Sequence, residues 1–194
     1  MGNMMHRLTV FCGSTMGSSP IYRDMAVTLA EAMRKAGLDL VYGGGNRGLM
    51  GVVADTLKSL GGTTIGVLPQ AMDLPQVRTK QVESQLIITD GMHSRKEKMY
   101  ELGDGFLALP GGIGTMEELM EAYTWRQLGY HHKPVALLDV DGYWKPLLEM
   151  LHKSVEAGFL DPRCLQTLLV DDNPSRLLDR MASQHVQLPD KLSP

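Results

Sequence analysis

Phe106-Leu107-Ala108-Leu109-Pro110-Gly111-Gly112-Ile113-Gly114-Thr115-Met116-Glu117-Glu118 joins a short apolar run to a helical stretch through a glycine-rich turn. The apolar run, residues 106–109, has the composition of a buried strand, and residues 115–128 have the spacing of a helix. A buried strand that runs through a short turn into a helix is the repeating unit of α/β folds with a parallel sheet.

The same alternation runs through the rest of the chain. Because crossovers between parallel strands are right-handed, it predicts a doubly wound, mostly parallel, Rossmann-like sheet with helices on both faces. We expect one domain at 6–186 and a loose tail at 187–194. Ligands of such folds bind beyond the carboxyl ends of the strands. The predicted strands are 8–12, 38–42, 63–68, 86–89, 106–109, 135–139 and 168–170, and the predicted helices are 20–35, 49–60, 94–102, 115–128, 143–157 and 174–185.

The composition of the 194 residues narrows the function classes. With 19 Lys and Arg against 22 Asp and Glu, the formal charge is −3, so no broad basic surface for nucleic acid is expected. The two cysteines make neither a disulfide framework nor a cysteine-based zinc site. No apolar stretch approaches the ~20 residues of a membrane span, and the N-terminus lacks a signal-peptide pattern. We therefore expect a cytoplasmic protein without nucleic-acid or membrane partners.

Two of the glycine-rich turns follow the first two strands. Gly13-Ser14 lets the backbone approach a ligand and offers a hydroxyl for phosphate or ribose, although an ordinary turn with a serine cap fits equally well. The second turn begins Gly43-Gly44-Gly45 and satisfies G-x-G-x-x-G with Gly48. No acidic residue closes the next strand, so an anion or sugar nest is favoured over dinucleotide binding. The absence of G-x-x-x-x-G-K-[ST] excludes a P-loop nucleoside triphosphatase.

The third candidate turn contains Ser94-Arg95-Lys96-Glu97. Ser94 and Glu97 have the spacing of a capping box, which would place Arg95 and Lys96 in the first helical turn. Cations in a first turn oppose the helix dipole, so their placement indicates a nearby anion. A solvated surface pair is the alternative, and the position of the turn at the carboxyl edge of a strand favours the anion.

The fourth turn is the one quoted at the start. The amides of Gly111, Gly112 and Gly114 at a helix N-terminus predict a phosphate cradle, with the Thr115 hydroxyl beside it. Glu118 has two interpretations that spacing alone does not separate. It is either the second half of a capping box with Thr115 or a carboxylate that faces the ribose of the bound nucleotide.

Two further groups receive structural interpretations. His131 and His132 follow a helix end, where cationic side chains are favoured, so no metal site is predicted there. Cys12 is interpreted as a small buried hydrophobic residue.

These turns resemble the LONELY GUY family of cytokinin riboside 5′-monophosphate phosphoribohydrolases. The matching motifs include Met92-His93-x-Arg95-Lys96 and Pro110-Gly111-Gly112-x-Gly114-Thr115-x-x-Glu118, and the match spans about residues 8–170. The resemblance implies a Rossmann-like homodimer that releases a purine base and ribose 5-phosphate and requires neither metal nor cofactor. An older label of this family, lysine decarboxylase, is set aside because a pyridoxal phosphate enzyme needs a Schiff-base lysine and a large cofactor domain.

The resemblance also assigns roles to individual residues. Arg95 and Glu118 correspond to the catalytic pair. The family often has a Glu shortly after the proline that closes the third strand, where this chain reads Pro69-Gln70-Ala71, and this departure affects the expected base preference. The substrate-binding positions implied by the family are Lys96, Gly112, Ile113, Gly114, Thr115, Met116, Glu117 and Thr124, and those predicted from the turns are Gly13, Ser14, Gly43, Gly44, Gly45 and Gly111.

We expect Glu118 to stabilise the positive charge that develops on the sugar and to orient the attacking water. Arg95 stays protonated and acts electrostatically on the phosphate or the departing purine. Glu117 and His93 are both candidates for protonating the base. Two other functions remain open, namely a general AMP nucleosidase and a nucleotide-sensing module without catalysis, because one fold supports many functions.

Overall fold

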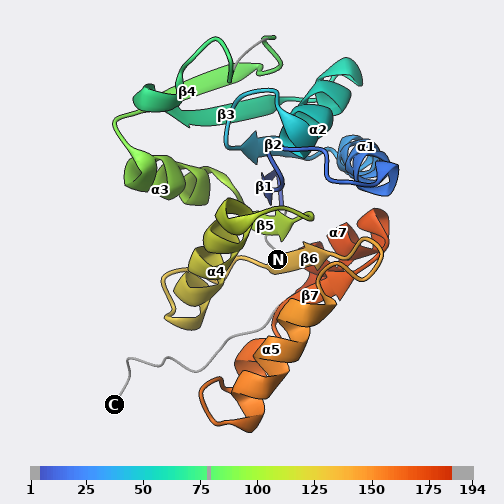
Figure 1. Ribbon diagram of the computed structural model, residues 1–194, viewed down its shortest axis with the longest axis vertical. Coiled ribbons are helices and arrows are strands. Elements are labelled where there is room, and N and C mark those ends of the chain that lie inside the picture. The colour runs from blue at the N-terminus through green and yellow to red at the C-terminus, as the bar shows by residue number, and fades with distance from the viewer. Residues whose placement is uncertain (1–4, 78–79, 185–194) are drawn as a thin grey trace.

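All the predicted strands join one sheet in the computed structural model, which describes residues 5–77 and 80–184 (Figure 1). The sheet has seven strands in the order β4-β3-β2-β1-β5-β6-β7, and every pair of neighbours is parallel. The strands are β1 (Arg7–Phe11), β2 (Asp39–Tyr42), β3 (Thr64–Pro69), β4 (Gln85–Thr89), β5 (Gly105–Ala108), β6 (Val135–Leu138) and β7 (Leu168–Asp171).

The order of the strands places a topological switch point beside β1. Leu8 of β1 lies opposite Leu40 of β2 on one side and Gly105 of β5 on the other. The chain winds outward from β1 to β4, crosses back over β1, and winds outward again from β5 to β7. A crevice forms at the carboxyl ends of strands whose connections diverge in this way, which is where such folds bind ligands.

Helices cover both faces of the sheet, so the predicted doubly wound fold is confirmed (Figure 1). Side chains alternate along β1: Val10 packs in the core that includes α1, α2 and α7, and Phe11 packs in the core that includes α3 and α4. Both residues are fully buried. The helices are α1 (Pro20–Lys35), α2 (Gly48–Ser59), α3 (Met92–Leu102), α4 (Ile113–Gln127), α5 (Lys145–Glu156), α6 (Pro162–Leu165) and α7 (Pro174–Ser183), with a 3₁₀ turn η1 (Gln70–Met72).

The start of α3 corrects one prediction. The helix begins at Met92 with Gly91 as its N-cap, so Ser94 is the third helical residue and not the cap. The Ser94 hydroxyl accepts a hydrogen bond from the Gly91 amide at 3.1 Å. The predicted Ser94–Glu97 capping box is therefore wrong, because glycine and the Ser94 side chain together satisfy the helix start.

Short elements escaped prediction. The one-turn helix α6 and the turn η1 are too short to show a periodic pattern of apolar residues. Among the helices of the described residues, none is long and apolar enough to cross a membrane. The predicted tail at 187–194 lies outside the described residues.

Candidate active site

The turns after β1, β2 and β5 meet at the carboxyl edge of the sheet. The Gly13 amide donates to the Pro110 carbonyl at 3.1 Å, and the Leu49 amide donates to the Gly13 carbonyl at 3.0 Å. These two bonds join three turns that are far apart in sequence. The glycine-rich segments that were singled out separately therefore form one continuous surface.

The turn after β2 contains glycine mainly because chain segments crowd around it. A Cβ on Gly48 would lie 2.2 Å from the Ser14 carbonyl carbon, and Gly44 and Gly45 have φ of 75° and 79°. The Gly45 amide already donates to Glu83 Oε1 at 3.1 Å, and the Asn46 amide donates to the Val77 carbonyl at 3.3 Å. Because those amides have acceptors in the protein, packing explains this turn as well as ligand binding does. Substrate contact by Gly43, Gly44 and Gly45 stays a prediction.

Arg95 and Glu118 form a buried ion pair at this edge. Arg95 Nη1 lies 2.8 Å from Glu118 Oε1, and the two side chains are 9% and 13% exposed. Arg95 Nε also donates to the Val67 carbonyl at 3.1 Å, which fixes the guanidinium against β3. Burial raises the pKa of the Glu118 carboxyl above its usual range, and the Arg95 charge opposes that shift.

The structure excludes one of the two interpretations of Glu118. Helix α4 begins at Ile113 with Gly112 as its N-cap, so Thr115 is the third helical residue and no Thr115–Glu118 capping box forms. Glu118 lies in the second turn and pairs with Arg95 of α3 instead. The two residues that the family resemblance singled out are thus in direct contact, across 23 positions of sequence.

A second ionic cluster lies next to that pair. The Lys96 ammonium contacts Glu117 and lies 3.0 Å from Glu121 Oε2, and the Tyr100 hydroxyl donates to Glu121 at 2.7 Å. Burial lowers the pKa of Lys96, but hydrogen bonds to Glu117 and Glu121 outweigh it and raise the pKa overall. Sequence reasoning missed Glu121 and Tyr100, although the four-residue spacing between Glu117 and Glu121 already placed both carboxylates on one helix face.

The first turn of α4 presents backbone amides without a capping side chain. Gly112, the N-cap, makes no side-chain cap hydrogen bond, and Met116 is the residue whose amide first bonds back to the Gly112 carbonyl, at 3.1 Å. The amides at the helix start are therefore available to an anion. Thr115 is buried, whereas Gly112, Gly114 and Ile113 are exposed.

The remaining predicted positions are partly or fully exposed around this edge of the sheet. Ser14 and His93 are exposed on the turn after β1 and at the start of α3. Thr124 is exposed on α4, seven residues beyond Glu117 and so on the same helix face. Met116 is 39% exposed in the first turn of α4. Their substrate contacts stay predictions.

His131 is not the cationic residue that was predicted at this helix end, whereas Cys12 is buried as predicted. Burial lowers the pKa of His131 to about 4, so it is neutral at pH 7 and not a cationic helix end. Its Nε2 lies 3.0 Å from the Ala122 carbonyl. Cys12 is buried, and burial raises the pKa of its thiol far above the usual range. No group of His, Cys, Asp or Glu in residues 5–77 and 80–184 is arranged to hold a metal ion.

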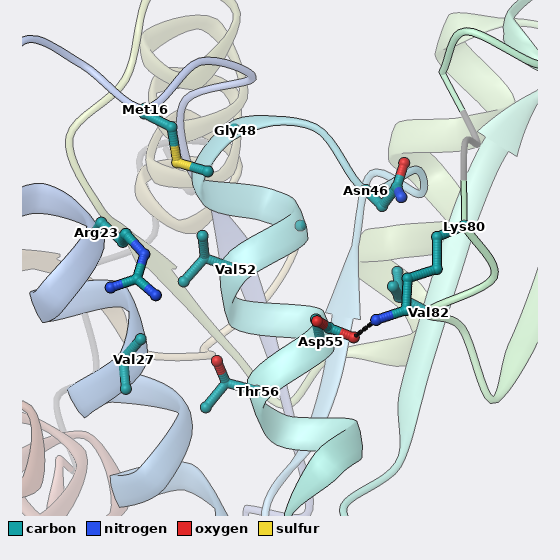
Figure 2. Close-up of a pocket in the computed structure, with 11 residues that line it drawn as sticks. Met16, Arg23, Val27, Asn46, Gly48, Val52, Asp55, Thr56, Lys80 and Val82 are labelled. Carbon is teal, nitrogen blue, oxygen red and sulfur yellow. Dashed lines mark hydrogen bonds and ion pairs between the residues drawn. The ribbon is translucent and has the colours of Figure 1, made fainter.

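Two pockets flank the turns. One pocket, of about 230 Å³, lies beside the turns that follow β1 and β5. It is lined by Gly13, Thr15, Gly17, Tyr22, Leu49, Pro110, Gly111, Gly112 and Tyr143. Figure 2 shows the other, between α1, α2 and the segment before β4, where Lys80 Nζ pairs with Asp55 at 2.6 Å. The pocket of Figure 2 includes Asn46 and Gly48 but neither Arg95 nor Glu118. The first pocket is the one that touches the amide-rich helix start.

Comparison with known proteins gives this arrangement a family. A family model described as "Possible lysine decarboxylase" matches residues 50–181. "Probable cytokinin riboside 5'-monophosphate phosphoribohydrolase LOGL3" of Oryza sativa subsp. japonica is 45% identical over 175 residues, which cover 90% of this chain and 82% of that protein. The chain belongs to the LONELY GUY family. A second member, "Cytokinin riboside 5'-monophosphate phosphoribohydrolase LOG3" of Arabidopsis thaliana, is 41% identical over 175 residues, covering 90% of this chain and 81% of that protein.

Solved structures extend the likeness of this LONELY GUY protein at the level of the fold. A molybdenum cofactor binding protein from Rippkaea orientalis superposes with a TM-score of 0.68 at 21% identity, covering 93% of this chain and 98% of that chain. The molybdenum cofactor carrier protein of Chlamydomonas reinhardtii gives 0.68 at 21%, covering 92% and 99%. At this identity the likeness concerns the Rossmann-like fold alone.

Proposed function

We propose that this chain hydrolyses the N-glycosidic bond of purine riboside 5′-monophosphates, cytokinin nucleotides among them. Water adds to the anomeric carbon, the carbon–nitrogen bond breaks, and free base and ribose 5-phosphate leave. The printed names of its relatives support this activity. The observation that carries it is the buried ion pair between Arg95 of α3 and Glu118 of α4. Glu118 lies in the second turn of α4, directly after the first turn, which has no capping side chain.

Each part of that arrangement has a role in the proposed reaction. The amides of Gly112, Ile113 and Gly114 bind the 5′-phosphate, which places the ribose over the neighbouring carboxylate. Breaking the glycosidic bond builds positive charge on the ribose, and a carboxylate in a buried site stabilises that charge strongly. Glu118 therefore acts as the charge-stabilising group and orients the water.

Arg95 has an electrostatic role in the proposal. Its guanidinium stays protonated, so it does not act as a general acid. Bonds to the Val67 carbonyl and Glu118 hold it in place before substrate arrives. Such preorganised charge stabilises the transition state without the cost of reorganising the site.

The activity is tested with AMP and with its N6-isopentenyl derivative, by chromatography of the released base. Glu118→Gln keeps the size of the side chain and removes its charge, so we expect kcat to fall about 100- to 1,000-fold while phosphate binding persists. Glu149→Gln, an exposed position on α5, is the matched control. Full turnover by Glu118→Gln would remove the proposed role of that carboxylate.

The same assay separates the substrate classes. The second candidate is a general AMP nucleosidase, because this chain lacks the Glu that the family often has shortly after Pro69 and instead has Gln70, exposed at the start of η1. Equal rates on AMP and its isopentenyl derivative would support that candidate. Binding of both without release of base would support a nucleotide sensor instead.

We also propose a homodimer. Ile113, Met116 and Met92 are 86%, 39% and 47% exposed at the starts of α4 and α3, and apolar side chains grouped in this way favour an interface. Sedimentation equilibrium should give twice the 21.4 kDa chain mass, and Ile113→Asp should shift the distribution toward the monomer. A monomeric wild-type protein at micromolar concentration would contradict the dimer.

A further inference from the structure

Tyr143 makes a contact that neither the motifs nor the catalytic pair explains. It lies in the turn between β6 and α5, and its hydroxyl donates a hydrogen bond of 2.5 Å to the Gly111 carbonyl. Gly111 is 32 positions earlier in the chain and belongs to the turn that leads into α4. The bond therefore ties the amide-rich start of α4 to a separate part of the fold.

The Tyr143 ring is held in place from several sides. It packs edge-on against Trp144 with ring centroids 5.0 Å apart, and against Tyr22 with centroids 6.1 Å apart. Trp144 is fully buried, and its amide donates to Asp139 at 2.9 Å. A hydroxyl on a ring held in this way has a fixed position, so it can fix the position of the carbonyl that it binds.

The peptide bond that Tyr143 holds has little stiffness of its own. It joins Gly111 to Gly112, and glycine adopts positive and negative φ with similar ease, so this peptide can rotate by half a turn at low cost. Gly111 has no substitute, because a Cβ there would lie 2.1 Å from Thr115 Oγ1 and 2.8 Å from the Gly13 amide. The close packing therefore requires glycine at position 111, and glycine leaves the Gly111–Gly112 peptide able to flip.

Fixing the carbonyl also fixes an amide. In a planar trans peptide the C=O and N–H groups point in opposite directions, so a Gly111 carbonyl held toward Tyr143 directs the Gly112 N–H away from it. Within residues 5–77 and 80–184, the Gly112 N–H has no hydrogen-bond acceptor. A flip would replace this free donor by a carbonyl oxygen, which repels an anion.

We propose that Tyr143 is a positioning residue that locks the Gly111–Gly112 peptide in the orientation that binds the substrate phosphate. The inference rests on the proposed function for the identity of the anion as a 5′-phosphate. It adds a group outside the glycine motif that determines whether the motif binds phosphate.

The test uses inorganic phosphate, so that it does not depend on turnover. In protein labelled with [¹⁵N]glycine, with the Gly112 signal assigned from Gly112→Ala, phosphate should shift the Gly112 amide resonance. Tyr143→Phe removes only the hydroxyl, and we expect phosphate affinity to fall about 3- to 10-fold, as for one lost hydrogen bond. Tyr22→Phe is the comparison, because Tyr22 packs against the Tyr143 ring and its hydroxyl makes no hydrogen bond to Gly111 or Gly112 in the described structure. The loss of affinity in Tyr143→Phe should exceed the loss in Tyr22→Phe.

A rescue variant separates peptide locking from a general loss of stability. The flipped peptide requires positive φ at residue 112, which alanine disfavours, and an added Cβ there meets no atom within 4 Å. Gly112→Ala placed in the Tyr143→Phe background, with phosphate affinity read from the Gly114 amide because the Gly112 signal is lost, should therefore recover about half of the lost affinity or more. An unimproved double variant, or equal losses in Tyr143→Phe and Tyr22→Phe, would overturn the proposal.

Kinetics give an independent measurement. Tyr143→Phe should raise KM for AMP by the same factor, with a smaller change in kcat. If the wild type cleaves no nucleotide, the proposed function fails, while the phosphate titration still decides the role of Tyr143. A wild type whose Gly112 amide does not respond to phosphate contradicts the positioning role itself.

Discussion

Gly43 leaves space for the side chain of Arg95, the proposed catalytic cation. A Cβ at this position would lie 2.0 Å from Arg95 Nη2, far inside the contact distance. The backbone of Gly43 does not require glycine for its conformation, because its φ is not positive. The residue is therefore small to make room for the guanidinium.

Gly43→Ala should separate activity from stability. Since the added methyl meets the end of a flexible side chain, Arg95 can move aside and the fold persists. We expect the free energy of unfolding to change by less than about 1 kcal/mol. The displaced guanidinium no longer matches Glu118, so kcat/KM should fall about 10- to 100-fold.

The control for that experiment is Gly91→Ala. Gly91 precedes α3, which carries Arg95, and an added Cβ there meets nothing within 4 Å. Steady-state kinetics and urea unfolding of both variants give the comparison. Equal activity losses in the two variants would show that Gly43 does not act through Arg95.

For individual residues, the family motifs singled out Arg95 and Glu118 but not the residues around them. Arg95 and Glu118 each lie in a short motif, and their contact follows once both strands are known to end at one sheet edge. Glu83, Tyr100 and Tyr143 carry no such motif. They reach the site through contacts over 18 to 38 positions, and only the folded structure reveals such contacts.

Among the elements, the starts of α4 and α5 make a useful comparison. The second helical residue of α4 is Gly114, and the second of α5 is Pro146. Proline is tolerated in a first turn because its missing N–H has no partner within the helix. The chain thus shows that proline fits at this helical position.

Gly114→Pro should remove one amide donor from α4 and leave the helix intact. Phosphate at 100 times its Kd stabilises the wild type by about 2.7 kcal/mol, which raises Tm by roughly 5–10 °C. Loss of one charge-assisted hydrogen bond weakens binding about 10-fold, so the rise in Tm at the same phosphate concentration should be roughly halved.

Gly114→Ala is the matched control, because alanine keeps the N–H. Differential scanning fluorimetry with and without phosphate measures both variants. A full rise in Tm in Gly114→Pro would exclude this amide from the phosphate site, and a low Tm without phosphate would show that the helix itself is damaged.

The limits of prediction at the element scale have a physical cause. Apolar periodicity locates the middle of a helix well, and α1 agrees with its prediction at both ends. Helix starts depend on one or two capping contacts, and for α3 and α4 the caps are glycines, which carry no side-chain signal. The predicted Ser94–Glu97 capping box failed for that reason, and the Thr115–Glu118 box, one of two interpretations of Glu118, does not form either.

Across the whole molecule, His131 links the global stability to pH. Its ring packs against Phe106 with centroids 5.1 Å apart, and its Nδ1 accepts the Lys133 amide at 3.2 Å. That acceptor requires a neutral ring. Burial lowers the pKa of His131 from its usual 6.5 to about 4 in the folded protein.

The sign of the resulting pH dependence is set by which state binds the proton first. As pH falls below about 6.5, the unfolded chain takes up a proton that the folded protein rejects until about pH 4. The neutral His131 ring makes its full contribution to the free energy of unfolding above pH 6.5. Between pH 6.5 and pH 4 the protein should lose about 2 kcal/mol of that free energy, after allowance for solvent screening. The free energy of unfolding of His131→Gln should therefore fall less than that of the wild type as the pH is lowered from 6.5 to 4.

Urea unfolding at several pH values between 4 and 7 checks the expectation. His132→Gln, which changes the exposed neighbour, should reproduce the wild-type curve. Parallel curves for the wild type and His131→Gln would show that the ring does not control stability in this range.

The central position of β1 also affects how the sheet forms while the chain is being synthesised. Its two neighbours pair Leu8 with Leu40 and with Gly105, so the ribosome must add 65 further residues after Leu40 before the second neighbour exists. At ordinary elongation rates that interval lasts about 3 to 13 s. Throughout it, the nascent chain carries an open strand edge in the middle of its future sheet, which makes the unfinished chain prone to aggregation until β5 is added.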